Sequence, residues 1–145
     1  MRTGGLGTDC LFVYGTLMPA SSHPMALRLA SESASLGPAT MSGRLYDLGD
    51  YPGAAPSADP ADRVHGMAVR LRDPGGSLRW LDAYEGCGEG DAEPQAYQRV
   101  IASALLKSGQ AIDAWIYYYR WPLGAARHLR NGCYVMPKPL ALQGI

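Results

Sequence analysis

Cys10–Tyr14 is a continuous run of apolar and aromatic residues that ends at Gly15. A short run of this kind, bounded by a glycine, is typical of a buried β-strand. Residues 1–9 before it are rich in glycine, and we expect them to form a flexible N-terminal segment. Residues 10–145 suffice for a single globular domain with a sizeable core, but not for two domains of ordinary size.

The charge of the chain argues against two classes of partner. Its 13 basic and 13 acidic residues cancel, so there is no broad electrostatic reason to expect binding to nucleic acid or to an anionic membrane. No apolar run approaches the roughly 18 residues that span a bilayer, and the first residues lack the apolar core of a signal peptide. The three cysteines, Cys10, Cys87 and Cys133, are odd in number and widely spaced, unlike a disulfide framework or a zinc site. We expect a soluble, cytoplasmic protein, and the sequence predicts no particular oligomeric state.

The 18 glycines and 11 prolines indicate many turns between short elements. Hydrophobic spacing predicts a helix at 24–36, with His23 or Ser22 as N-cap, and a second at 77–84, with Ser77 as N-cap and Gly86 as the stop. The other predicted segments are strands at 39–48, 64–71, 97–106 and 111–120, a turn-rich stretch at 49–56, an acidic loop at 86–96, a hairpin turn at 107–110 and an irregular tail after Pro122. Mostly β structure with two helices favours an α+β fold with a small barrel or curled sheet over a sandwich.

Glu85 is the residue whose position most strongly suggests chemistry. It lies at the C-terminal end of the second predicted helix, where the helix dipole disfavours an acidic side chain. Beside Tyr84 and close to Trp80, its carboxylate is expected to have a raised pKa. A general base works best when its pKa lies near the operating pH. The alternative is an exposed glutamate at a helix end that serves solubility.

Two glycine-containing stretches can form other parts of a pocket. After the first predicted strand, the turn at 14–17 can point its backbone N–H groups at one anion, such as a carboxylate or an oxyanion. A simple turn after a strand is the alternative for this stretch. Within 43–53, aromatic residues flank the turn Pro52-Gly53, where they can line a pocket wall or close one end of a barrel.

Together these stretches resemble the γ-glutamylcyclotransferase-like family, which includes the AIG2-like proteins. The matches follow the family order from residue 12 to about residue 119, and four motifs in register are more specific than any one alone. The matching residues are Tyr14, Gly15, Thr16 and Leu17, then Gly43, Leu45, Tyr46, Asp47, Tyr51, Pro52 and Gly53, then Leu81, Asp82, Glu85 and Gly86, and finally Tyr97 and Arg99.

The resemblance implies a small mixed β-barrel with flanking helices and a cavity beside the end of the first strand. It implies that Tyr14, Gly15, Thr16 and Leu17 hold the γ-glutamyl part of a small-molecule substrate, and that Glu85 is the general acid/base. The implied activity releases an amine or amino acid from a γ-glutamyl compound, in an acyl transfer that closes the glutamyl part to 5-oxoproline. The identity of the leaving amine stays open.

This chemistry needs few protein groups. The substrate supplies its own nucleophile, its α-amine, so neither a serine nor a cysteine is required, and we expect no metal and no other cofactor. Glu85 can take a proton from the amine and later deliver one to the leaving group. Holding the substrate folded for ring closure would supply much of the acceleration.

Aromatic residues are expected to complete the pocket. Period-two alternation places Trp115, Tyr117 and Tyr119 on one face of the last long strand, with Ile116 and Tyr118 on the other. The family tends to place a substrate-contacting tyrosine on this strand, and Tyr117 is our choice. Tyr51, in the Pro-Gly stretch, is the second aromatic residue that we expect at the substrate.

Other interpretations depend on residues near Glu85. Arg99 is expected to pair with a helix end or an acidic neighbour, and an ion pair with Glu85 would favour a non-catalytic small-molecule binding module. Cys87 could belong to a thiol enzyme, although no histidine is spaced to pair with it. The acidic loop at 87–96 is expected near the pocket mouth, where it could screen substrates.

Overall fold

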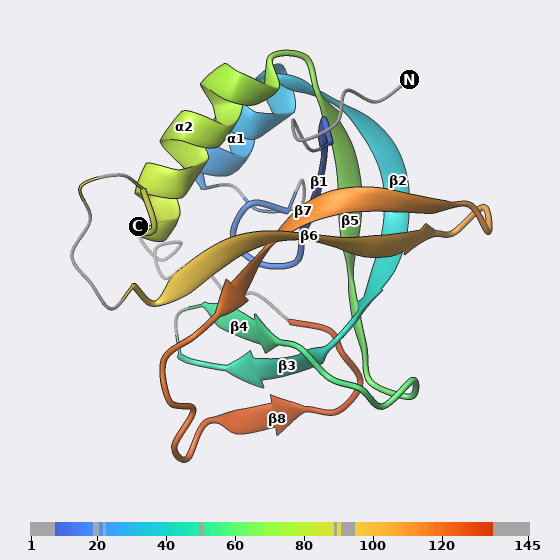
Figure 1. The fold of residues 1–145 in the computed structure, drawn as a ribbon, viewed down its shortest axis with the longest axis vertical. Coiled ribbons are helices and arrows are strands. Elements are labelled where there is room, and N and C mark those ends of the chain that lie inside the picture. Colours follow the sequence, from blue (N-terminus) through green and yellow to red (C-terminus); the bar gives the residue numbers. More distant parts are fainter. Residues whose placement is uncertain are drawn as a thin grey trace.

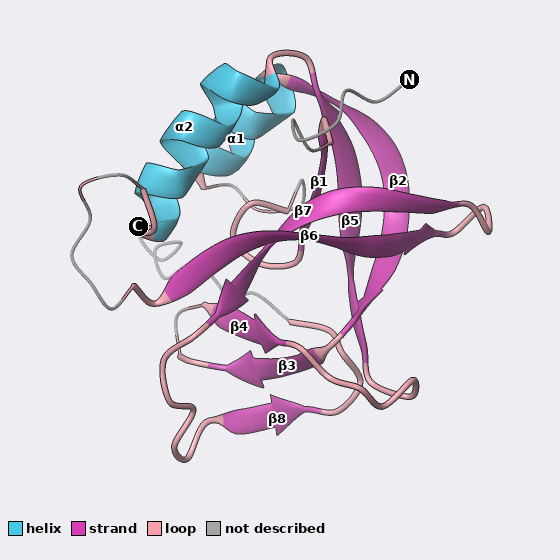
Figure 2. Cartoon of the chain, viewed as in Figure 1, coloured by secondary structure: helices cyan, strands magenta, loops and turns pink. Residues whose placement is uncertain are grey.

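The computed structural model describes residues 8–18, 21, 23–49, 51–88, 90 and 95–134. In this part of the chain a strongly curved sheet closes into a barrel, and two helices lie together against one side of it (Figures 1 and 2). The predicted α+β fold, a small mixed barrel with flanking helices, is confirmed. Residues 1–7 of the predicted flexible segment lie outside the described residues.

The helices and strands of the described residues are short, as the frequent glycines and prolines indicate. In chain order they are β1 (Cys10–Val13), α1 (Pro24–Ser31), β2 (Ser33–Ser42), β3 (Arg44–Asp47), β4 (Pro52–Ala55), β5 (Arg63–Leu71), α2 (Pro74–Glu85), β6 (Tyr97–Leu106), β7 (Ala111–Tyr119) and β8 (Arg127–Leu129).

Five strands form the closed barrel, in the order β1-β5-β2-β6-β7. The parallel pairing of Leu11 on β1 with Trp115 on β7 closes the ring, and the other neighbours in it are antiparallel. A smaller extension begins where Ala54 of β4 pairs with Tyr118 of β7, and β3 and β8 continue it. β1 is therefore enclosed by two strands of the barrel, and its C-terminal end is where the first loop leaves the sheet.

The first strand is buried on both faces, as its continuous apolar run predicts. Phe12 and Tyr14 belong to the cluster inside the barrel. Leu11 and Val13 point the other way, into a second cluster between the barrel and the helices, where Leu81 of α2 also packs. β1 therefore links the two cores and carries the Tyr14–Leu17 loop between them.

The predicted faces of the last long strand are also confirmed. Ile116 and Tyr118 belong to the cluster inside the barrel. Tyr117 belongs to the cluster beneath the helices, with Trp115 and Tyr119 packed against its edge. The alternation places the Tyr117 side chain on the same side of the barrel as α2.

Several of the predicted strands are correct, and others need correction. The segments at 64–71, 97–106 and 111–120 are strands to within one residue at each end, and a turn joins the last two. The strand expected over 39–48 is two strands, because the chain bends at Gly43, where a side chain would lie 2.9 Å from the Ala55 carbonyl oxygen. The expected turn-rich stretch contains β4, and the expected irregular tail contains β8.

The first helix is shorter than the spacing predicts. It is capped by His23, whose Nδ1 accepts a hydrogen bond from the Met25 N–H, and it ends at Ser31 rather than at residue 36. From Ser33 onward the chain pairs with β5, because tertiary pairing overrides a local helical pattern. Ser22, the other predicted cap, lies outside the described residues.

The second helix begins earlier than predicted and ends where predicted. Its N-cap is Asp73 rather than Ser77, and the Asp73 carboxylate accepts a hydrogen bond from the Gly76 N–H. Ser77 is buried instead, and its hydroxyl donates to the Glu32 carboxylate at 2.7 Å, which ties α2 to the end of α1. Gly86 ends the helix with a left-handed φ of 76°, a conformation that glycine adopts without a side-chain penalty.

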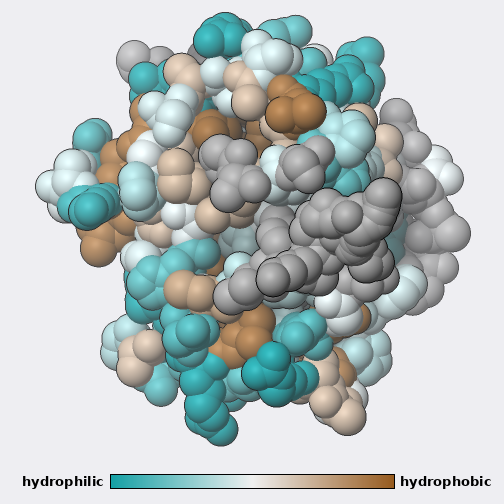
Figure 3. All heavy atoms as spheres, turned by 180° about the vertical axis from the view of Figure 1, so that it is seen from behind, coloured by the Kyte–Doolittle hydropathy of each residue, from teal (hydrophilic) through white to brown (hydrophobic). Residues whose placement is uncertain are grey.

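The outer surface mixes polar and apolar residues. Seen from behind, separate hydrophobic patches lie among hydrophilic residues (Figure 3). The most exposed large apolar side chains of the described residues are Leu27 on α1, Ile101 and Leu105 on β6, and Tyr51 and Trp121 in loops. Exposed apolar residues of this kind are common on folded proteins. No helix within the described residues is long and apolar enough to cross a membrane.

Candidate active site

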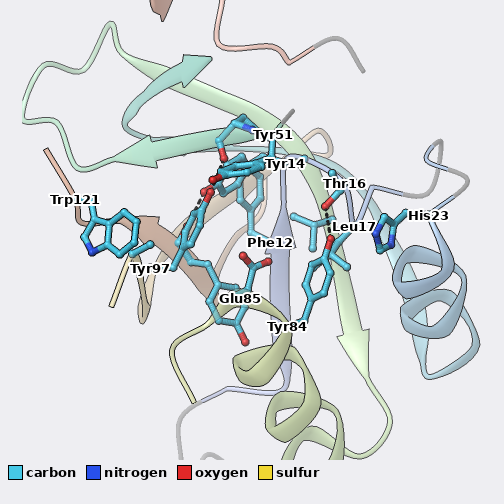
Figure 4. A pocket seen from close by; sticks show the side chains of 15 residues that line it. Phe12, Tyr14, Thr16, Leu17, His23, Tyr51, Tyr84, Glu85, Tyr97 and Trp121 are labelled. Carbon is cyan, nitrogen blue, oxygen red and sulfur yellow. Dashed lines mark hydrogen bonds between the residues drawn. The ribbon is translucent and has the colours of Figure 1, made fainter. Parts of the chain in front are cut away.

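A cavity of about 530 Å³ opens at the end of β1, between the barrel and the C-terminal end of α2 (Figure 4). Its described lining contains every residue that the sequence singled out as catalytic or substrate-binding. These residues are Tyr14, Gly15, Thr16, Leu17, Tyr51, Glu85 and Tyr117. Residues from four distant parts of the chain therefore meet around one cavity.

Glu85 is the last residue of α2, and its carboxylate points into this cavity (Figure 4). Burial, and to a lesser degree the negative charge of Asp82 on the same helix, together raise the pKa of the carboxyl to about 7. The C-terminal end of the helix dipole acts in the same direction. At neutral pH the group therefore lies close to the midpoint of its titration, where it can both take up and release a proton.

The Glu85 carboxylate makes no hydrogen bond or ion pair with another described residue. Arg99, whose pairing with Glu85 would have favoured a binding module, pairs with Asp82 instead, at 2.7 Å between Nε and Oδ1. The expectation that Arg99 bonds an acidic neighbour is confirmed. The Glu85 carboxylate is thus left available to a ligand in the cavity.

The Tyr14–Leu17 loop forms the wall beside β1. The Met18 N–H donates to the Gly15 carbonyl at 3.0 Å and closes a tight turn. Within the described residues, no hydrogen bond uses the backbone N–H of Gly15, Thr16 or Leu17. Unpaired N–H groups in such a turn are suited to binding one negatively charged oxygen.

Close packing explains why a glycine occupies position 15. A Cβ atom there would lie 2.8 Å from Cγ and 2.9 Å from Cδ of Pro52, closer than such carbon atoms pack. The loop after β1 therefore rests directly on the start of β4. Both segments line the cavity.

Two buried tyrosine hydroxyls hold this contact in place. Tyr14 donates to the Tyr117 carbonyl at 2.6 Å and accepts from the Ala54 N–H at 3.1 Å. Tyr97 donates to the Pro52 carbonyl at 2.9 Å. Burial raises the pKa of both Tyr14 and Tyr97 well above the ordinary value, so both hydroxyls keep their protons. These bonds fix the position of β4 relative to the barrel.

A further hydrogen bond joins the loop to the helix that carries Glu85. The hydroxyls of Thr16 and Tyr84 lie 2.8 Å apart (Figure 4). The His23 ring meets the Tyr84 ring edge-on, with 5.4 Å between the centroids. Since Tyr84 directly precedes Glu85, these contacts set the distance between the loop N–H groups and the carboxylate.

The two predicted aromatic contacts differ in their surroundings. The Tyr117 ring lines the cavity, but its hydroxyl donates to the Asp82 carboxylate at 2.7 Å. Tyr51 lies at the edge of the cavity, 46% exposed, with its ring 6.5 Å from that of Tyr97. Tyr51 is therefore open to solvent, whereas the hydroxyl of Tyr117 is already engaged by Asp82.

Other residues of the cavity wall were not selected from the sequence. They are Phe12, Val13, His23, Pro52, Tyr84, Ala96, Tyr97 and Trp121. Tyr84, Tyr97 and Pro52 stand in or next to the recognised motifs, which is the signal that could have identified them. His23 and Trp121 have no such signal, because only the folded chain brings them to the end of β1.

The residues that line the cavity bear on the other interpretations of the sequence, namely a thiol enzyme, a metal site and a substrate-screening acidic loop. The described lining of the cavity contains no cysteine, so the thiol interpretation of Cys87 gains no support. Within the described residues, no cluster of three or more histidine, cysteine, aspartate or glutamate side chains is arranged to hold a metal ion. Of the acidic loop, residues 89 and 91–94 lie outside the described residues, and with them the prediction that it screens the cavity.

Comparisons with known proteins identify the family of the chain and relatives that share its fold. A family model described as "Gamma-glutamyl cyclotransferase, AIG2-like" matches residues 11–136. A search of curated proteins gives no significant match. An AIG2-like protein from Mus musculus is similar in structure, with a TM-score of 0.67 at 20% identity, covering 92% of this chain and 98% of the mouse chain.

Other solved structures share the fold. The protein ytfP from Escherichia coli has a TM-score of 0.58 at 28% identity, covering 87% of this chain and 96% of that one. YkqA from Bacillus subtilis has a TM-score of 0.64 at 20% identity, and the match covers 88% of this chain but only 39% of that longer protein. A structure named gamma-glutamyl cyclotransferase has a TM-score of 0.57 at 16% identity, covering 83% of this chain and 69% of that one.

Proposed function

Because this chain belongs to the gamma-glutamyl cyclotransferase, AIG2-like family, we propose that it releases an amine or amino acid from a γ-glutamyl compound and forms 5-oxoproline. The observation that carries the proposal is the Glu85 carboxylate, which points into the cavity that residues 15–17 also line and has no hydrogen-bond or ion-pair partner among the described residues. A proton acceptor and a set of N–H donors around one cavity are the two groups that this reaction requires.

The proposed reaction is an internal displacement. The α-amine of the γ-glutamyl group attacks the γ-carbonyl carbon, a C–N bond forms within a five-membered ring, and the original amide C–N bond breaks. Glu85 takes a proton from the α-amine and delivers one to the departing amine. Water is not consumed, and the acceleration comes from proton transfer together with holding the chain folded for ring closure.

The Gly15–Leu17 N–H groups are the proposed binding site for a negatively charged oxygen of the substrate. Such an oxygen is present in the α-carboxylate and develops on the carbonyl during attack. Tyr51 and Tyr117 are proposed to contact the substrate from the remaining walls. Tyr117 would do so through its ring, because its hydroxyl proton is donated to Asp82.

The test of this function is a panel of γ-glutamyl compounds, including glutathione, γ-glutamyl amino acids and γ-glutamyl amines. We expect at least one of them to yield 5-oxoproline and the free amine in equal amounts. Binding of γ-glutamyl ligands without turnover of any member would instead support the non-catalytic binding module. Failure both to bind and to turn over the panel would contradict the proposal altogether.

The reaction is expected to depend on pH through Glu85. Its pKa is raised to about 7, so the carboxylate form needed to accept a proton is lost as the pH falls through that value. We expect kcat/KM to rise with pH to a plateau, with the midpoint of the acid limb near the Glu85 pKa. Measurement of kcat/KM from about pH 4 to 8.5 in buffers of constant ionic strength checks this. An acid limb centred near the ordinary pKa of an exposed glutamate would contradict it.

The cavity also favours one kind of leaving amine. Its described lining contains Glu85 but no lysine or arginine, and aromatic rings of Tyr51, Tyr97 and Trp121 lie along one side. A carboxylate on the leaving group would enter without a lysine or arginine to pair with and would face a second carboxylate. We therefore expect γ-glutamyl-phenethylamine to be turned over about tenfold or more faster than γ-glutamyl-phenylalanine, measured as kcat/KM. These two substrates differ only in that carboxylate, and equal rates would contradict the expectation.

A further inference from the structure

Asp82 holds a second carboxylate beside Glu85, one helical turn earlier on α2. Its Oδ1 accepts hydrogen bonds from Arg99 Nε and from the Tyr117 hydroxyl, each at 2.7 Å, and its Oδ2 accepts from Arg99 Nη2 at 3.0 Å. The guanidinium of Arg99 in turn lies over the Trp115 ring, 4.1 Å from its centroid. The Asp82 carboxylate is therefore fixed from both β6 and β7.

This ion pair is more enclosed than the other ion pairs of the described residues. The side chains of Arg99 and Asp82 are 22% and 20% exposed. Two nitrogen atoms of the planar guanidinium donate to the two oxygen atoms of the carboxylate, which is a bidentate ion pair. Cross-strand pairing places Arg99 opposite Tyr117, so that both reach the same acceptor. Asp82 and Arg99 do not line the cavity, whereas Tyr117 does.

Four tyrosines lie around Glu85, and Asp82 is the charged side chain that acts on it. Tyr84 lies beside it on α2, Tyr14 at the end of β1, Tyr97 on β6 and Tyr117 on β7. Burial raises the pKa of each of these tyrosines above its ordinary value, so all four stay neutral.

Two further titratable groups lie near this part of the site. His23 lines the cavity before α1, and Cys87 follows α2 and packs against the cluster beneath the helices. Among the charged side chains of the described residues, Asp82 lies one helical turn from Glu85 and carries Arg99 as its ion-pair partner. The two have opposite signs and would act on Glu85 in opposite directions.

We propose that Asp82 and Arg99 are positioning residues that together set the pH at which Glu85 exchanges its proton and hold the Tyr117 ring in the cavity wall. This inference rests on the proposed function of Glu85. The Asp82 charge opposes ionisation of Glu85, and the Arg99 charge offsets part of that opposition. The bonds that Asp82 accepts keep both charges at a constant distance from Glu85.

If replacing Asp82 and replacing Arg99 moved the pH midpoint of kcat/KM in opposite directions, this role would be distinguished from a purely structural one. Asp82→Asn removes the negative charge and leaves Arg99 unneutralised, so the midpoint of the acid limb of kcat/KM should fall by about one pH unit. Arg99→Gln leaves the Asp82 charge uncompensated, so the midpoint should rise by about the same amount. The double variant should return toward the wild-type midpoint, because both charges are absent.

A matched control is available elsewhere in the fold. Arg44 pairs with Asp62 at the same distance, 2.7 Å, in the sheet extension away from the cavity. Arg44→Gln breaks an ion pair by the same substitution and should leave the midpoint unchanged. Midpoints that move in the same direction in Asp82→Asn and Arg99→Gln, or that do not move, would overturn the inference.

A second readout separates this inference from the proposed function. The Glu85 carboxyl can be titrated by ¹³C NMR in protein labelled at glutamate, with its signal assigned by its absence in Glu85→Gln. The same opposite shifts are expected in this titration, which needs neither substrate nor turnover. An inactive protein that shows the shifts would contradict the proposed reaction but leave the electrostatic role intact. An active protein without the shifts would contradict the inference alone.

Discussion

Replacing Glu85 by glutamine is expected to lower the rate of 5-oxoproline release by about 100-fold or more, which is the usual contribution of a general acid/base. Glutamine keeps the size and shape of the side chain but cannot take up the proton of the α-amine. The loss should appear mainly in kcat, because the γ-glutamyl part is proposed to be held by the loop of residues 14–17. Rates of product formation at saturating substrate, compared with the wild type, give the measurement.

The stability of Glu85→Gln provides the control for folding. The pKa of Glu85 is raised in the folded protein from its ordinary 4.5 to about 7, so between these values the folded state binds more protons than the unfolded state. The glutamate therefore lowers stability progressively as the pH rises through this window. Glutamine removes that cost, so we expect the variant to melt at a higher temperature than the wild type, by more at pH 8 than at pH 5. A stable variant that keeps full activity would show that Glu85 is not the acid/base.

Gly15→Ala is expected to lower kcat/KM by about 10- to 100-fold, without any change in the titratable groups. The added Cβ would lie 2.8 Å from Cγ of Pro52. The Pro52 ring is stiff, and its carbonyl is held by the Tyr97 hydroxyl, so the loop must move instead. A displacement of about 1 Å at a substrate-positioning group can cost about 100-fold in rate. Steady-state kinetics on the best substrate of the panel measure the effect.

Gly75→Ala is the matched control for this substitution. Gly75 lies in the first turn of α2, and a Cβ atom there would meet no other atom within 4 Å. We expect the control to leave activity unchanged and to increase stability slightly, because alanine favours the helix. If Gly15→Ala were as active as Gly75→Ala, the loop would not position the substrate.

The barrel strands could be predicted largely because their apolar patterns are simple. The unbroken apolar run of β1, and the two long segments rich in apolar and aromatic residues from Tyr97 to Leu106 and from Ala111 to Tyr119, are visible without the structure. Pro52–Ala55 has no such pattern, and its strand exists because Ala54 pairs with Leu45 on one side and Tyr118 on the other. Pairings between distant segments of this kind are not encoded in local spacing.

The residues of the candidate site also divide into those that local sequence predicts and those that only the tertiary fold brings together. Glu85 could be selected because the helix end and the following glycine are local features of the sequence. The hydrogen bond from the Tyr117 hydroxyl to Asp82 could not be predicted, because it depends on how α2 packs against the paired strands β6 and β7. His23 and Trp121 reach the cavity from loops, and only the tertiary fold brings them there.

The identity of the product is the most direct test of the proposed chemistry. Incubation of the wild-type protein with an active γ-glutamyl amine in H₂¹⁸O, followed by mass spectrometry, separates ring closure from hydrolysis. Ring closure consumes no water, so we predict unlabelled 5-oxoproline and one equivalent of amine. Glutamate carrying ¹⁸O would show that water is the nucleophile, and would contradict the role assigned to the substrate's own amine and to Glu85 as the base that deprotonates it.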